Sequence, residues 1–140
     1  MEKGKMPGFC GMSADEATTF CASWLPSWTG NDPERLLNFY TEDAFYSDPA
    51  VPSGLTGVAA IRPYFEKLLG AFPEWIWTHE RSLPVEDGFL NYWSARLNAA
   101  VDAPRWEGIC IVRLRGRLIF RNEVFFDRSP ILTHLKVGGR

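Results

Sequence analysis

An aspartate that follows an aromatic run is the side chain best placed to do chemistry in this sequence. It lies in the segment FYSDP, which ends at Pro49. A short strand over residues 44–48 would place Tyr46 and Asp48 on the same side, because side chains alternate along a strand. Pro49 favours extended backbone at the residue before it and would therefore fix the end of the strand. A carboxyl group held among aromatic rings loses hydration, which suits it to exchange protons near neutral pH.

A structural role for Asp48 is equally compatible with the sequence. Aspartate side chains accept hydrogen bonds from nearby backbone N–H groups in turns, and glycine and proline favour such turns. Two prolines and two glycines follow between residues 49 and 57. The sequence therefore predicts either a catalytic acid or a turn-capping residue at this position.

Three amphipathic helices are expected in the first half of the chain. The segment SADE, which begins at Ser13, has the form of a capping box, and Asp32 precedes a proline in the manner of a helix start. Apolar residues recur at helical spacing over residues 61–72, which places Tyr64 and Leu68 on one face.

The pattern changes to strands after residue 75. Four alternating segments follow, with turn signals at EDG and at Gly116. Helices followed by an antiparallel meander indicate an α+β fold. We expect a cone of three N-terminal helices packed on a curved, mainly antiparallel sheet that encloses a pocket. Residues 13–135 would form a single domain, with tails at residues 1–12 and 136–140.

Composition narrows the function classes. A net charge of −2 does not favour nucleic-acid binding, and no apolar run has the length of a membrane span. Three cysteines and two histidines without metal-ligand spacing predict a reduced, cytoplasmic protein with no metal or cofactor. Ten Phe, six Trp and four Tyr exceed what packing needs, so some rings are expected to line a cavity for a small apolar ligand.

The order and spacing of three segments resemble the nuclear transport factor 2-like superfamily, particularly its SnoaL-like and ketosteroid-isomerase-like branches. These segments are GNDPERLLNFYTEDAFYSDP, GLTGVAAIRPYFEKLL and GRLIFRNEVFFD. The resemblance spans residues 13–128. It implies the conical fold, a homodimer formed through the sheet face, and a strand that carries Tyr46 and Asp48 to the pocket.

The resemblance also implies further site residues. Arg96 and Glu123 would assist Asp48 and Tyr46 in catalysis, although surface exposure of Arg96 and a cross-strand ion pair of Glu123 are the alternatives. The ligand pocket would be lined by Trp24, Tyr64, Leu68, Tyr92, Asn98, Cys110 and Phe125.

Two departures from the family pattern limit the choice of reaction. Trp24 and Cys110 stand near the positions where the isomerases have strong donors to the developing oxyanion, which disfavours steroid isomerisation. Asn98 replaces the acid of the arginine–acid pair found in epoxide hydrolases of the superfamily. We therefore expect a cofactor-free isomerase, cyclase, dehydratase or hydrolase of another specificity. The alternative is a binding or protein-interaction module without catalysis.

Overall fold

The protein is described by a computed structural model that covers residues 12–138. A six-stranded sheet has the order β2-β1-β6-β5-β4-β3, and the contact between β1 and β6 is its only parallel pairing within the described range. In chain order the elements are α1 (Ala14–Trp24), a 3-10 turn (Leu25–Trp28), α2 (Pro33–Leu37), β1 (Tyr40–Asp48), β2 (Val51–Thr56), α3 (Val58–Ala71), β3 (Ile76–Val85), β4 (Gly88–Arg96), β5 (Arg105–Arg115), β6 (Leu118–Phe126) and α4 (Ser129–Gly138).

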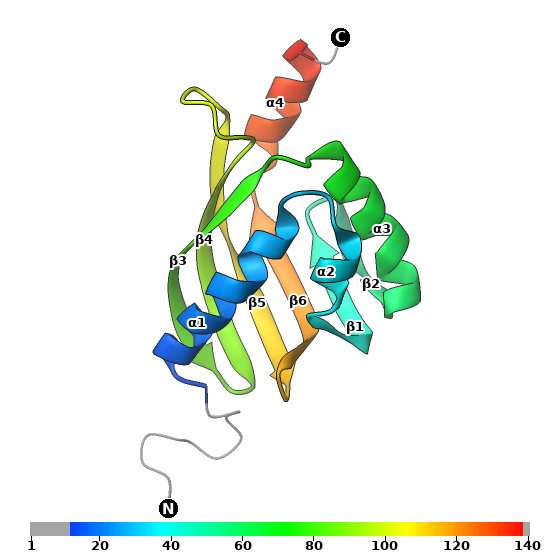
Figure 1. The fold of residues 1–140 in the computed structure, drawn as a ribbon, viewed down its shortest axis with the longest axis vertical. Coiled ribbons are helices and arrows are strands. Elements are labelled where there is room, and N and C mark those ends of the chain that lie inside the picture. Colours follow the sequence, from blue (N-terminus) through cyan, green and yellow to red (C-terminus); the bar gives the residue numbers. More distant parts are fainter. Residues whose placement is uncertain (1–11, 139–140) are drawn as a thin grey trace, which may run out of the picture.

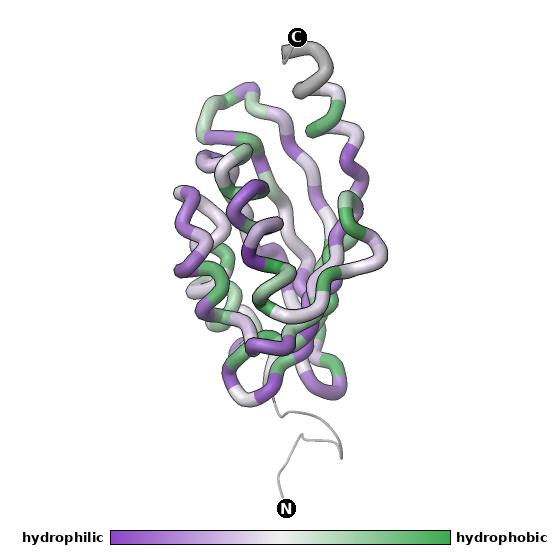
Figure 2. Tube along the Cα trace, turned by 90° about the vertical axis from the view of Figure 1, so that its right-hand side faces the viewer, coloured by the Kyte–Doolittle hydropathy of each residue, from purple (hydrophilic) through white to green (hydrophobic). Residues whose placement is uncertain are grey.

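The helices α1, α2 and α3 cover one face of the curved sheet, and α4 extends from one end (Figure 1). A side view separates the helical layer from the strands and shows hydrophobic and hydrophilic residues following one another along the chain (Figure 2). None of the helices between residues 12 and 138 combines the length and the apolar character that crossing a bilayer requires. The helices and the concave sheet face thus enclose the core.

Local signals explain where the helices begin. At α1, the Ser13 hydroxyl accepts from the Glu16 backbone N–H at 3.1 Å, and the Glu16 carboxylate accepts from the Ser13 N–H at 2.8 Å. At α2, the Asp32 carboxylate accepts from the Arg35 N–H at 3.2 Å. The turn before α3 is made by Gly57, whose φ of 91° favours glycine.

The helical part differs from the expected three N-terminal helices. α2 has only five residues, a 3-10 turn follows α1, and α4 forms where a tail was expected from residue 136. The segment between Asp48 and α3, expected to be a loop, contains β2, which pairs with β1. Pro63 lies inside α3, whose first residue is Val58.

The two faces of the sheet take alternate residues of the same strands. We call the side that faces the helices the inner face, and it carries Trp93 of β4, Cys110 of β5 and Val124 of β6, all buried. We call the opposite side the outer face. Gly108 allows the inner face to pack closely, because a side chain there would lie 2.8 Å from the Trp93 ring.

Candidate functional site

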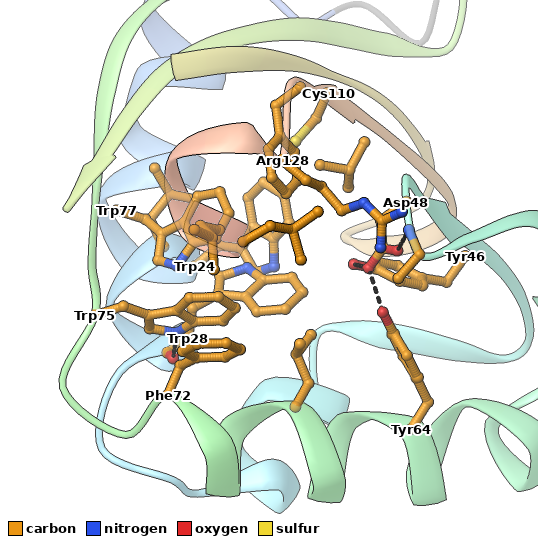
Figure 3. A pocket seen from close by; sticks show the side chains of 17 residues that line it. Trp24, Trp28, Tyr46, Asp48, Tyr64, Phe72, Trp75, Trp77, Cys110 and Arg128 are labelled. Carbon is orange, nitrogen blue, oxygen red and sulfur yellow. Dashed lines mark hydrogen bonds between the residues drawn. The ribbon is translucent and has the colours of Figure 1, made fainter. Parts of the chain in front are cut away.

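A cavity of about 180 Å³ lies between the helices and the inner face of the sheet (Figure 3). Its apolar wall is largely aromatic, and the Trp and Phe rings in it are Trp24, Trp28, Phe72, Trp75, Trp77 and Phe126. The rings fix one another: Trp28 contacts Trp77 at a centroid distance of 5.8 Å, and the Trp75 indole N–H donates to the Trp28 carbonyl at 2.6 Å. The wall is therefore rigid and offers a small apolar molecule large contact surfaces.

Asp48 lies at the polar end of this cavity and is 7% exposed. Its Oδ2 accepts hydrogen bonds from the hydroxyls of Tyr46 at 2.7 Å and of Tyr64 at 2.8 Å. Its Oδ1 accepts from the backbone N–H groups of Ala50 at 2.8 Å and of Val51 at 3.1 Å. One oxygen thus caps the turn between β1 and β2, while the other belongs to the cavity.

Three elements bring this group together. Tyr46 and Asp48 share a side of β1, and the register irregularity between them lies where the strand turns into β2. Tyr64 and Leu68 lie one turn apart on α3, so both face the cavity. Trp24 and Cys110 of the expected pocket set also line the cavity, from α1 and β5.

Both tyrosines are held in the neutral form. Burial raises the pKa of Tyr46 well above its ordinary value, and the negative charge of Asp48 raises it further. Burial and then the Asp48 charge likewise raise the pKa of Tyr64, while the positive charge of Arg128 opposes this with a smaller effect. Since each hydroxyl donates its proton to Asp48, its oxygen has lone pairs left to accept from a ligand.

Arg128 is a cavity residue that the sequence did not indicate. It follows β6, is exposed, and extends its guanidinium toward Asp48 at the cavity mouth (Figure 3). Ile131 and Leu132, from the first turns of α4, line the same end. No local pattern marks these residues, because only the path of the chain after β6 brings them to the cavity.

The expected site residues of β4 and its following turn lie outside the cavity. Tyr92 is on the outer face, where the Arg81 guanidinium stacks 4.5 Å from its ring centroid. Arg96 donates hydrogen bonds to the carbonyls of the turn at residues 98–100, at 2.8 to 3.3 Å. The Asn98 side chain accepts from a backbone N–H in that turn. Tyr92 and Asn98 were expected in the pocket lining and Arg96 in catalysis, but none of the three lines this cavity. Trp93 and its alternate neighbours occupy the inner face of β4, and Asn98 belongs to the turn that follows.

The expected residues of β6 are on the outer face for the same reason. The Glu123 carboxylate accepts a hydrogen bond from the Arg121 guanidinium at 3.2 Å. The sequence suggested a cross-strand ion pair for Glu123, and the observed pair joins two residues of the same strand. Phe125 is 49% exposed. Val124 and Phe126 line the cavity instead. Glu123, expected to assist catalysis, and Phe125, expected in the pocket lining, are each one residue away from a cavity position.

Two further groups on the inner side have structural roles. His79 Nδ1 lies 2.7 Å from the Asn91 amide oxygen, away from the cavity lining. Burial raises the pKa of the Cys110 thiol, so it faces the cavity as a neutral, largely apolar group. Among the side chains that the structure describes, no three metal-binding groups come together.

Comparison with solved structures places this fold among known ones. A protein of Catenulispora acidiphila with a ketosteroid isomerase-like fold, solved with trimethylamine, has a TM-score of 0.66 at 20% identity, over 81% of this chain and 89% of that one. A protein of Shewanella putrefaciens, proposed to be a SnoaL-like polyketide cyclase, has a TM-score of 0.70 at 14% identity, over 97% and 90%. A SnoaL-like protein of unknown function from Burkholderia thailandensis has a TM-score of 0.68 at 13% identity, over 83% and 98%.

The sequence comparison agrees with the structural one. No curated protein matches the chain. The family model of the SnoaL-like domain matches residues 22–122, which include the last three residues of α1, all of α2 and α3, and most of the sheet. The chain therefore belongs to the SnoaL-like domain family.

Proposed function

We propose that this protein binds a small, largely apolar organic molecule in the aromatic cavity and performs cofactor-free acid–base chemistry on it. Asp48 would accept the proton and return it. The observation that carries the proposal is a buried carboxylate at the end of an aromatic cavity, with two neutral tyrosine hydroxyls on one of its oxygens. The reaction class would be an isomerisation, cyclisation, dehydration or hydrolysis, and the names of the similar structures support this by analogy of fold.

The hydroxyls of the two tyrosines can stabilise the negative charge both before and after the proton transfer. Before reaction, the hydroxyls of Tyr46 and Tyr64 stabilise the negative charge of Asp48. When Asp48 takes a proton, the charge moves to the substrate, and a hydroxyl can turn to donate to it there. The negative charge thus moves only a short distance and stays within reach of the same hydrogen-bond donors. Arg96 and Glu123 have no part in this proposal, because they lie outside the cavity.

A second candidate is a ligand-binding or interaction module without catalysis. One observation favours it: Asp48 accepts four hydrogen bonds, which fill the acceptor positions of a carboxylate. A base must free one of these positions before it can take a proton. A module that only binds a ligand has no such requirement.

We also propose that the outer face pairs two copies of this chain in the cytoplasm. Phe125 is half exposed there, and it pairs across the sheet with Ile109 of β5, which gives the face an apolar centre. The two described cysteines are free thiols, which suits a reducing compartment. Sedimentation of the wild type and of Phe125→Asp tests the pairing: a dimer that becomes a monomer is expected, and a wild-type monomer contradicts it.

Proton exchange with solvent tests the catalytic proposal without knowledge of the substrate. Small ketones such as acetophenone are incubated with the protein in D2O, and deuterium at the carbon next to the carbonyl is followed by NMR. We expect Asp48→Asn to lose roughly 100-fold or more in exchange rate. Asp43→Asn is the matched control, because Asp43 is an exposed residue of the same strand, and it should keep the wild-type rate.

The affinity of each variant for the ketone and the folding of each variant are measured alongside the exchange rate. Thermal unfolding confirms that Asp48→Asn is folded, and Tyr64→Phe provides a second variant that leaves the turn at Ala50 intact. If Asp48→Asn binds the ketone as tightly as the wild type but no longer exchanges deuterium into it, the result supports catalysis. Equal exchange rates in wild type and a folded Asp48→Asn protein would refute it and leave the binding module.

A further inference from the structure

Arg128 lines the cavity, and among the side chains that the structure describes its hydrogen-bond donors have no partner. Its side chain extends toward Asp48 and contributes to the cavity lining (Figure 3). Within residues 12–133, no hydrogen bond or ion pair joins its guanidinium to another group. By contrast, four other arginines have carboxylate partners, in the pairs Arg62–Glu34, Arg113–Asp87, Arg115–Asp43 and Arg121–Glu123.

The geometry explains why Arg128 and Asp48 do not pair. All four acceptor positions of the Asp48 carboxylate are taken by Tyr46, Tyr64 and two backbone N–H groups. Between residues 12 and 133 the five N–H donors of this guanidinium thus have no protein acceptor, and the side chain lines the cavity. A ligand oxygen would supply that acceptor.

Charge balance at this end of the cavity restricts the ligand further. The charges of Asp48 and Arg128 offset each other, so a neutral ligand adds no uncompensated charge to a site walled by aromatic rings. The cavity, at about 180 Å³, is slightly larger than the apolar cavities of about 150 Å³ that hold a benzene molecule. These properties fit a neutral molecule of about one ring that carries an oxygen acceptor.

We propose that Arg128 binds the carbonyl oxygen of such a ligand and holds it beside Asp48. This inference rests on the proposed function for the identity of the site, but it concerns a different residue and a different property. Neither Trp24 nor Cys110 is a strong donor to an oxyanion, and Arg128 supplies this donor from the segment after β6.

The proton step at this site is balanced without a further reactant. One tyrosine hydroxyl turns away from Asp48 Oδ2, which frees an acceptor position. The C–H bond next to the carbonyl breaks, and its proton goes to this oxygen. The electron pair forms a C=C bond, and the carbonyl π pair moves to the oxygen, where Arg128 neutralises the charge. Return of the proton from Asp48 to the same carbon reverses the step, whereas its return to a conjugated carbon moves the double bond and gives an isomer.

Four small probes test the assignment by NMR titration of the purified protein. Acetophenone is a neutral acceptor, ethylbenzene has no acceptor, benzoate is an anion and benzylammonium is a cation. The wild type should bind acetophenone about tenfold more tightly than ethylbenzene, because a hydrogen bond from a charged donor is gained. In Arg128→Leu the two affinities should become equal through loss of acetophenone binding, while Arg128→Lys should keep part of the preference.

Controls and contradictory results separate this inference from the proposed function. Arg35→Gln, an exposed residue of α2, should leave all four affinities unchanged. A preference for acetophenone that persists in Arg128→Leu, or tighter binding of benzoate or benzylammonium than of acetophenone, would overturn the assignment. Since binding requires no turnover, an Arg128-dependent preference without deuterium exchange would leave the inference standing and refute the catalytic proposal.

Discussion

The inner and outer faces of the sheet use alternate residues of the same strands, yet they differ in burial and in charge. The inner face presents buried rings and a neutral thiol to the cavity. The outer face presents half-exposed charged groups such as the Arg113–Asp87 pair, whose side chains are 41% and 27% exposed. A step of one residue therefore separates a ligand-binding position from a solvated one.

This difference shows where the free energy of folding is concentrated. Burial of a large apolar side chain contributes about 1.5–3 kcal/mol, whereas an exposed ion pair contributes about 1 kcal/mol or less. Substitutions at neighbouring positions on one strand should consequently have very different effects. Three experiments test the difference between buried and exposed groups, from the largest expected effect to the smallest.

The neighbours Trp93 and Tyr92 on β4 give the sharpest contrast. Trp93 is 1% exposed and packs 4.4 Å from Trp77, measured between ring centroids, whereas Tyr92 lies on the outer face beside Arg81. Trp93→Ala should lower the free energy of unfolding by about 3–5 kcal/mol, because it leaves a hole in the core. Tyr92→Ala should cost about 1 kcal/mol. Urea denaturation measures both, and equal losses would contradict the assignment of faces.

The thiol of Cys21 should make the interior sensitive to high pH. Burial raises the pKa of Cys21 to about 12, whereas a thiol in the unfolded chain titrates near 8.5. The stability that follows from this difference is fully present below pH ~8.5 and is lost as the pH rises toward 12. Cys21→Ala should therefore flatten the fall of the unfolding free energy between pH 9 and 10 by about 1.4 kcal/mol per pH unit. An identical slope in both proteins would show that Cys21 is accessible to water.

The Arg113–Asp87 pair should give the smallest effect. Its guanidinium donates two hydrogen bonds to one carboxylate oxygen, at 3.0 and 2.7 Å, and a third to the other at 2.8 Å. Because both side chains meet solvent, Asp87→Asn should lower the unfolding free energy by only about 0.5–1 kcal/mol. The difference should shrink in 1 M salt, which screens exposed charges. A loss that salt does not reduce would indicate a buried pair.

The features of the fold that follow from short-range signals were predictable. The capping box at Ser13, the start at Asp32 and the turn at Gly116 each depend on a few adjacent residues. β2 was missed because its sequence VPSGLT contains a proline and a glycine and shows no alternation. α4 was not expected, although Pro130 in its first turn and the glycine at its end are both typical of helix boundaries.

The residues of the candidate site also divide into those with a local sequence signal and those without one. Tyr46 and Asp48 follow from alternation within β1, and Tyr64 and Leu68 follow from helical spacing within α3. The face of β4 could not be fixed, because each of its two alternating sets contains an aromatic residue. Arg128 has no local signal, since its position depends on how the chain continues after β6.

A crystal structure of the protein soaked with acetophenone would test the central claim most directly. The account predicts electron density for the ring against Trp28 and Trp77, with the carbonyl oxygen within hydrogen-bond distance of Arg128 and the methyl group beside Asp48. Both tyrosine hydroxyls should remain within reach of that carboxylate. An Asp48 side chain turned to bulk water, or a cavity filled by the protein's own side chains, would contradict the account.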